Sequence, residues 1–150
     1  MTVLVWDGDT LATDRQANDG SLAWESSKAW YISGKTGVCI ATGVGMLKDI
    51  IVAREWWKEG GQPSHWPFSH TTNNCQFIVV DGGGLHLFDG TPYPETRAFT
   101  PCAFGHGRDF AYGALAMGAN AKEAVEAANK YSLHCGIGVE LFTLHRNGDV

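Results

Sequence analysis

The stretch that decides the fold lies at the start of the chain and reads Thr2-Val3-Leu4-Val5-Trp6-Asp7-Gly8-Asp9-Thr10-Leu11-Ala12-Thr13-Asp14-Arg15. Two β-branched and apolar runs, Thr2 to Trp6 and Thr10 to Asp14, flank a short polar insert of the kind that closes a hairpin. With the fold-back centred on Gly8, residues equidistant from it pair, and Thr2 lies opposite Asp14. The sequence therefore predicts a hairpin that brings the second residue of the chain to a carboxylate.

This pairing has a chemical consequence if Met1 is removed. Thr2 would then carry a hydroxyl and a free α-amine on the same residue. An α-amine has an unperturbed pKa of roughly 7.7 to 8.0 and is a usable general base near neutral pH, whereas a lysine at about 10.4 must first be perturbed. Thr2 is therefore a candidate nucleophile with its own base.

The pattern resembles proteasome β-type subunits, most of all the bacterial HslV peptidase and its short relatives in the N-terminal-nucleophile hydrolase superfamily. The similarity runs from Thr2 to about Thr143. In that family the mature N-terminal threonine is the nucleophile, an aspartate at the end of the second strand supports a lysine, and the lysine lies beside the threonine. Thr2, Asp14 and Lys28 match that order with somewhat tighter spacing.

Two later segments extend the resemblance. The turn Gly105-His106-Gly107, ahead of a predicted helix, resembles the family's Gly-Ser-Gly, with His106 in place of the serine. The segment from Gly138 to Thr143 resembles the family's last strand, while Ser132 to Gly138 offers no acid where proteasome subunits place an aspartate.

The resemblance also assigns the oxyanion to a backbone N–H at Gly43 or a neighbour. A second predicted hairpin, with Ser33-Gly34-Lys35-Thr36 as its turn, places Lys28 across from Ala41 and Thr42 and next to Gly43. Two plainer interpretations stay open at this point. Gly43-Val44-Gly45 is equally compatible with a simple strand-to-helix turn. Asp14 and Lys28, considered without Thr2, are typical of an ordinary cross-strand ion pair, and their combination with Thr2 favours the catalytic interpretation.

Composition sets the remaining limits. A chain of 150 residues, 44% hydrophobic and 18% charged, predicts a single globular domain spanning 1–150. A formal net charge of −5 without a basic run argues against nucleic acid as a partner. The sequence has no apolar window of about 20 residues and no signal-like start, which predicts a cytoplasmic protein without membrane segments.

Cysteine and histidine spacing argues against metal chemistry. Cys39, Cys75, Cys102 and Cys135 are widely separated and are predicted to be buried thiols. His65 and His70 share one loop, but their spacing matches no strong zinc pattern. We therefore predict no metal and no other cofactor.

The order of predicted elements indicates the fold class. After the two hairpins come a helix from Met46 to Glu59, three strands (76–80, 85–88 and 101–104), helices from Asp109 to Met117 and from Ala121 to about Tyr131, and a strand from Val139 to Leu144. Asn120 and Glu123 predict a capping box before the third helix. Hairpins with helices in blocks predict an α+β fold. The resemblance implies a four-layer αββα sandwich of two antiparallel sheets between helix layers.

These observations predict a threonine-type endopeptidase or amidohydrolase that works through an acyl-enzyme on Thr2. A noncatalytic shell subunit that retains Met1 is the alternative. Peptides or unfolded proteins are the implied substrates, in a homo-oligomeric ring whose ATPase partner the sequence does not name. Trp56, Trp57, Trp66 and Phe68 gather at one helix end and the following loop, and we expect this region to contribute to contacts between subunits, with core packing of the loop's rings as the other possibility.

Overall fold

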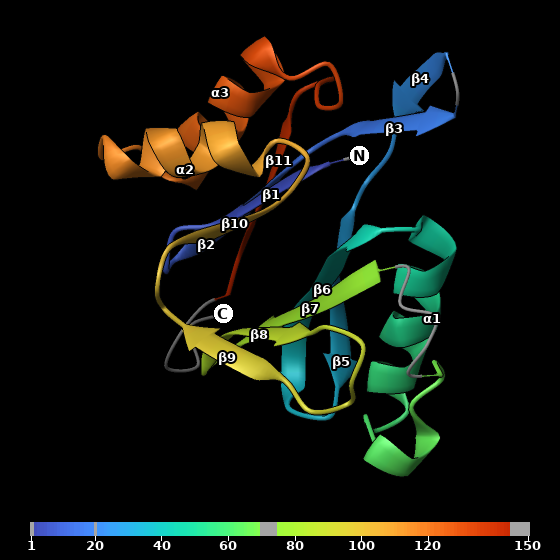
Figure 1. Ribbon diagram of the computed structural model, residues 1–150. Coiled ribbons are helices and arrows are strands. Elements are labelled where there is room, and N and C mark those ends of the chain that lie inside the picture. The colour runs from blue at the N-terminus through green and yellow to red at the C-terminus, as the bar shows by residue number, and fades with distance from the viewer. Residues whose placement is uncertain (1, 20, 70–74, 145–150) are drawn as a thin grey trace. The chain divides into compact units, whose positions relative to one another are not determined.

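The computed structural model describes residues 2–19, 21–69 and 75–144, and its strands and helices follow the predicted α+β order (Figure 1). In chain order they are β1 (Val3–Trp6), β2 (Thr10–Asp14), β3 (Gln16–Asp19), β4 (Leu22–Glu25), β5 (Ala29–Gly34), β6 (Gly37–Gly45), α1 (Leu47–Lys58), η1 (Pro63–His65), β7 (Cys75–Asp81), β8 (Gly84–Phe88), β9 (Glu95–Ala98), β10 (Cys102–Gly105), α2 (Arg108–Ala116), α3 (Ala121–Tyr131) and β11 (Val139–Thr143). The elements divide into two compact units, one formed by residues 2–28 and 99–143 and the other by residues 29–98. The predicted single domain spanning 1–150 stays a prediction.

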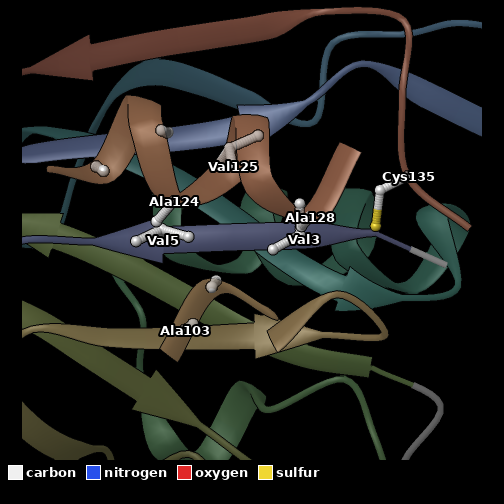
Figure 2. Packing of buried hydrophobic residues seen from close by; sticks show 10 residues of the cluster. Val3, Val5, Ala103, Ala124, Val125, Ala128 and Cys135 are labelled. Atoms are coloured by element: carbon white, nitrogen blue, oxygen red, sulfur yellow. The ribbon is translucent and has the colours of Figure 1, made fainter. Parts of the chain in front are cut away.

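The first unit contains a four-stranded antiparallel sheet in the order β10-β1-β2-β11, against which α2 and α3 pack. Val3 and Val5 of β1 alternate onto the face that carries the helices, and Figure 2 shows them beside Ala124, Val125 and Ala128 of α3. Most helix residues in this core are alanines, and short side chains let a helix lie close to a sheet. The predicted capping box is confirmed, because the Asn120 side chain accepts from the Glu123 N–H and the Glu123 carboxylate accepts from the Asn120 N–H.

The register of the first hairpin differs from the predicted one by one residue. Val5 lies opposite Ala12 and Leu4 opposite Thr13, so the fold-back is centred between Gly8 and Asp9 and not on Gly8. The Asp7 N–H donates to the Thr10 carbonyl at 3.2 Å, which leaves a two-residue loop, and Gly8 takes φ +95 there. In this register Asp14 lies opposite Val3, so the predicted Thr2–Asp14 pairing is wrong.

The second unit is built on a five-stranded antiparallel sheet in the order β5-β6-β7-β8-β9. Alternate residues of β6 and β7, among them Cys39, Ala41, Phe77 and Val79, share one core with the buried face of α1. The predicted hairpin around Lys35 and Thr36 is present, but β5 begins at Ala29, which pairs with Thr42. Lys28 therefore precedes the strand instead of lying within it opposite Ala41 and Thr42.

β3 and β9 were not predicted. The sequence indicates a polar connection from Arg15 to Ser27 with a weak strand around Ser21 to Trp24, and that strand corresponds to β4. β3 pairs with β4 as a separate ribbon in which every β4 residue is exposed. β9 is a polar edge strand next to β8. Neither strand has a buried apolar face, which is the signal on which a sequence-based strand prediction depends.

The aromatic cluster predicted to meet another subunit is core. Trp56 and Trp57 are each 5% exposed, and the Trp56 ring centroid lies 4.8 Å from that of Trp66 and 5.6 Å from that of Phe88. Trp66 and Phe68 are partly buried against the same cluster. Core packing, the other possibility that the sequence left open, accounts for these rings, and the surplus of exposed aromatic surface expected there is absent from the described part of this region.

All four cysteines are free and buried, as predicted. The buried environment raises the pKa of Cys75 to about 11, so this thiol stays protonated at neutral pH. No helix in the described ranges is long and apolar enough to cross a membrane.

A polar network in the second unit provides a test of the fold. The Asp81 carboxylate accepts hydrogen bonds from the Gly83 N–H and the Thr36 hydroxyl and lies 2.8 Å from His86 Nε2. Burial alone would raise the pKa of Asp81, but the hydrogen bonds from His86, Gly83 and Thr36 outweigh it and hold the pKa below the usual aspartate value. A depressed pKa stabilises the fold above the unfolded value of about 3.9, and this contribution is lost as the pH falls through the folded value.

We therefore expect Asp81→Asn to lower the free energy of unfolding by about 1–3 kcal/mol at pH 7, because hydrogen bonds to a charged group are lost. The difference from the unchanged protein should shrink below pH 4. Urea unfolding at pH 7 and pH 3.5 measures both values, with Asp109→Asn as the control because the Asp109 side chain is 93% exposed. An equal difference at both pH values would contradict the role assigned to the Asp81 charge.

Candidate active site

Asp14 is the centre of the candidate site and is fully buried at the end of β2. Its Oδ1 accepts hydrogen bonds from the Thr2 hydroxyl (2.7 Å), the Lys28 ammonium (2.8 Å) and the Val3 N–H (3.1 Å). Its Oδ2 accepts from the N–H groups of Gln16 (3.3 Å) and Gly136 (3.2 Å). Every donor belongs to the first unit, and together they replace the water that burial removes from this carboxylate.

Thr2 lies immediately before β1 and is 5% exposed. Its hydroxyl donates to Asp14 Oδ1 and accepts from Lys28 Nζ at 2.6 Å, so the oxygen lies between a carboxylate and an ammonium. The hydroxyl reaches Asp14 even though the strand register does not pair the two residues, because Thr2 precedes the paired part of β1. The contact between Thr2 and Asp14 that the sequence predicted is thus present, through a different geometry.

The glycine turn after β10 fixes the main chain of Thr2. The Thr2 carbonyl accepts from the Gly107 N–H at 3.3 Å. Gly105 has φ +94, and a Cβ at that position would lie 2.2 Å from the Thr2 carbonyl oxygen. The close approach of the two backbones therefore requires glycine at position 105.

Lys28 completes the group and is largely buried, with 11% of its side chain exposed. Burial lowers the pKa of Lys28 below the usual lysine value, although the neighbouring Asp14 carboxylate opposes the change. An ammonium with a lowered pKa gives up a proton more readily than an exposed lysine does. It also places positive charge 2.6 Å from the Thr2 oxygen, where negative charge develops when the hydroxyl loses its proton.

His106 is exposed in the glycine turn, and its ring centroid lies 4.9 Å from that of His134. Desolvation lowers the pKa of His106, and the electrostatic effect of the nearby His134 and Arg108 side chains lowers it further. The hydrogen bond from Gly136 could not be predicted from the sequence. The family resemblance leads us to expect an acidic side chain in this segment, whereas the segment contributes a backbone N–H to Asp14.

Gly43 belongs to the second unit, where it lies within β6 and pairs with Phe77. A Cβ at position 43 would lie 2.5 Å from the Gln76 carbonyl oxygen and 3.1 Å from a side-chain carbon of Ile50 in α1. Close packing therefore explains the glycine, and it lies in a strand, not in the strand-to-helix turn considered from the sequence. The structure brings Thr2, Asp14 and Lys28 together, while the oxyanion role of Gly43 stays a prediction.

No three His, Cys, Asp or Glu side chains lie close enough to hold a metal within residues 2–19, 21–69 and 75–144. His70, one of the two histidines considered from the sequence, lies outside these ranges. The chemistry that the described groups support is activation of the Thr2 hydroxyl for attack on an electrophilic carbon.

The coupling between Asp14 and Lys28 can be measured as stability. We expect Asp14→Asn to cost about 3–5 kcal/mol of unfolding free energy, because it leaves the ammonium of Lys28 buried without its charge partner. Lys28→Met should cost less, because Asp14 keeps its other donors. The double variant should cost less than the sum of the two single changes.

Urea unfolding of the four proteins in this cycle gives the interaction energy. Lys122→Met serves as the control, since Lys122 forms an exposed pair with Glu126 and should change stability by less than about 1 kcal/mol. Strict additivity of the Asp14 and Lys28 changes would show that the two charges are not coupled.

Comparison with solved structures identifies the fold. HslV of Trypanosoma brucei is 19% identical, with a TM-score of 0.68 over 96% of this chain and 98% of that one. BPH of Thiobacillus denitrificans is 16% identical and has a TM-score of 0.70 over 99% of this chain and 100% of that one. Its complex with epoxomicin gives 16% identity and a TM-score of 0.68 over 97% and 98% of the two chains. No protein-family model and no curated protein matches the sequence. The chain therefore has the fold of the proteasome β-type and HslV-like N-terminal-nucleophile hydrolases, as its resemblance to them predicts.

Proposed function

We propose that the protein is a threonine peptidase that hydrolyses amide bonds through an acyl-enzyme on Thr2 after Met1 is removed. The observation that carries the proposal is the position of the Thr2 hydroxyl, 2.7 Å from a buried carboxylate and 2.6 Å from a buried ammonium. The HslV fold supports a hydrolase of the same family.

The proposed reaction begins with attack of the Thr2 oxygen on the substrate's carbonyl carbon. The hydroxyl proton passes to the α-amine of the mature chain, directly or through a water. Collapse of the tetrahedral intermediate breaks the carbon–nitrogen bond, and the leaving amine takes that proton. Water then attacks the ester. One proton of this water passes through the α-amine to the threonine oxygen, and the other stays on the released acid.

Lys28 and Asp14 support the reaction electrostatically in this proposal. The Lys28 ammonium stabilises the alkoxide and lowers the proton affinity of the nearby amine, while Asp14 holds the ammonium in place. The oxyanion is assigned to the backbone N–H of Gly43 or a neighbour, and this assignment rests on the family resemblance.

The proposed substrates are peptides or unfolded proteins, and the proposed assembly is a homo-oligomeric ring that encloses the Thr2 sites. The family resemblance supports both, and it leaves open which ATPase would deliver the substrate. The four cysteines are free and buried, which supports a location in a reducing compartment. The proposed location is the cytoplasm.

Native-start protein should lose Met1 and hydrolyse small peptides, which intact mass and fluorogenic peptide turnover measure. Thr2→Ala should abolish turnover because no hydroxyl remains, and Thr2→Ser should retain part of it. Lys28→Ala should lower kcat by at least about a hundredfold, because the alkoxide loses its closest positive charge. Lys122→Ala and Thr100→Ala, both at exposed positions, are the matched controls.

Epoxomicin is an independent probe, since the BPH structure contains it. It should raise the melting temperature of the unchanged protein and leave that of Thr2→Ala unaltered. Retention of Met1 in every preparation, with no turnover and no response to epoxomicin, would favour the noncatalytic shell subunit.

The oligomeric state of the active protein can be tested separately. Active protein should sediment as a homo-oligomer, because a ring is the arrangement that confines an open N-terminal site away from folded proteins. Sedimentation velocity at micromolar concentration, followed by turnover assays on each fraction, tests this. An active species at the mass of one chain, 16.2 kDa, would rule out the ring and favour a free-standing amidohydrolase.

A further inference from the structure

Residues 132–138 form the loop between α3 and β11 (Figure 1). Hydrogen bonds hold this loop at the end of β2 and at the last turns of α3. The Gly136 N–H donates to Asp14 Oδ2 at 3.2 Å, and the Gly136 carbonyl accepts from the Arg15 N–H at 3.0 Å. Two residues later, the Gly138 carbonyl accepts from the Asn129 side-chain amide at 2.9 Å. Residues 136–138 are therefore held between the end of β2 and the last turns of α3.

Ile137, between these anchors, has φ +58. This left-handed conformation is rare for any residue with a side chain and is strained for a β-branched one. Ile137 is 44% exposed, so deep burial does not explain why an isoleucine holds this conformation. Hydrogen bonds of Gly136 and Gly138 flank this residue on both sides.

The Gly136 N–H differs from the other donor to Asp14 Oδ2 in its distance along the chain. The other donor to Oδ2, the Gln16 N–H, lies only two residues along the chain and comes with the local turn after β2. Gly136 is 122 positions away in sequence and donates to Oδ2 from outside that turn. Rotation of the carboxylate would move Oδ1 relative to both Lys28 Nζ and the Thr2 hydroxyl, and hydrogen bonds weaken steeply when their geometry changes.

We propose that the strained backbone at Ile137 aims the Gly136 N–H at Asp14, so that this loop sets the orientation of the carboxylate against Lys28 and Thr2. Ile137 and Asn129 are positioning residues in this scheme, because neither contacts a reacting atom. The inference rests on the proposed peptidase function, which it deepens by adding a structural control on the Thr2 hydroxyl.

Substitutions in and beside the loop distinguish an effect of the strained Ile137 backbone from an effect of added loop flexibility. Ile137→Gly relieves the strain and frees the loop, Ile137→Val keeps the β-branch, and Asn129→Asp removes the side-chain donor to Gly138 with almost no change in shape. Leu133→Gly, in the same loop at a position 90% exposed and without a positive φ, is the matched control for added backbone freedom.

Two measurements on the full chain are needed, namely kcat and KM on a fluorogenic peptide and hydrogen exchange of the Gly136 amide. Ile137→Gly should keep its melting temperature or raise it, yet lose protection at Gly136 and fall about ten- to a hundredfold in kcat with KM within about twofold. Asn129→Asp should change kcat in the same direction. Ile137→Val should retain both protection and kcat, and Leu133→Gly should retain kcat.

The outcomes distinguish the two proposals. Wild-type kcat and wild-type Gly136 protection in Ile137→Gly would overturn the positioning role while the peptidase function stands. Loss of Gly136 protection in Ile137→Gly and Asn129→Asp, in a protein that shows no turnover before substitution, would support the positioning of Asp14 and overturn the peptidase function. An equal fall in kcat for Leu133→Gly would reduce the effect to loop flexibility and would also overturn the positioning role.

Discussion

The buried carboxylate of Asp14 is the constraint on which the rest of the site depends. A charge removed from water is costly unless opposite charge and hydrogen-bond donors replace the water, and Asp14 is fully buried. The replacement comes from Lys28, from the Thr2 hydroxyl and from three backbone N–H groups. These donors lie at the start of β1, after β2, before β5 and after α3, so the need to satisfy one side chain fixes four segments that are distant in sequence.

The packing of the first unit keeps those segments in register. Asp7 joins the hairpin to the helices, because its Oδ1 accepts from the N–H groups of Asp9 and Thr10 while its Oδ2 accepts from the Ala121 N–H at the start of α3. At the other end of β1, a Cβ on Gly107 would come within 3.0 Å of Val3, Ala128 and Cys135, so β1, α3 and the loop after α3 meet around this glycine. Displacement of α3 would therefore move both the Thr2 carbonyl and the Gly136 N–H.

The sequence contains most of this site, but not the geometry that joins it. Thr2, Asp14 and Lys28 could be named because their order in the chain matches that of the family they resemble. The helices and most strands followed from apolar periodicity, whereas β3 and β9 did not. The register of the first hairpin could not be predicted, because Asp7-Gly8-Asp9 is compatible with a fold-back centred on Gly8 or between Gly8 and Asp9. Only the hydrogen bond between Asp7 and Thr10 selects the second of these. The Gly136 contact uses a backbone N–H, which every non-proline residue has, so no residue type signals it. The aromatic residues of α1 and of the loop after it pack in one core, and the sequence left core packing and subunit contacts both open because composition alone does not distinguish a large core from a large contact surface.

The position of the Thr2 oxygen indicates why a free N-terminus matters for the proposed chemistry. The hydroxyl donates to Asp14 Oδ1, but this oxygen also accepts hydrogen bonds from Lys28 and from the Val3 N–H, so little of its acceptor capacity is left to take the proton. Lys28 donates to the same oxygen and therefore carries its own proton, even though burial lowers its pKa. Neither neighbour of the hydroxyl supplies a strong, unprotonated base. An α-amine, with a pKa of roughly 7.7 to 8.0, is partly unprotonated near neutral pH. Asp14 and Lys28 thus orient and polarise the hydroxyl, and in the proposed mechanism the proton acceptor comes from Thr2 itself once Met1 is removed.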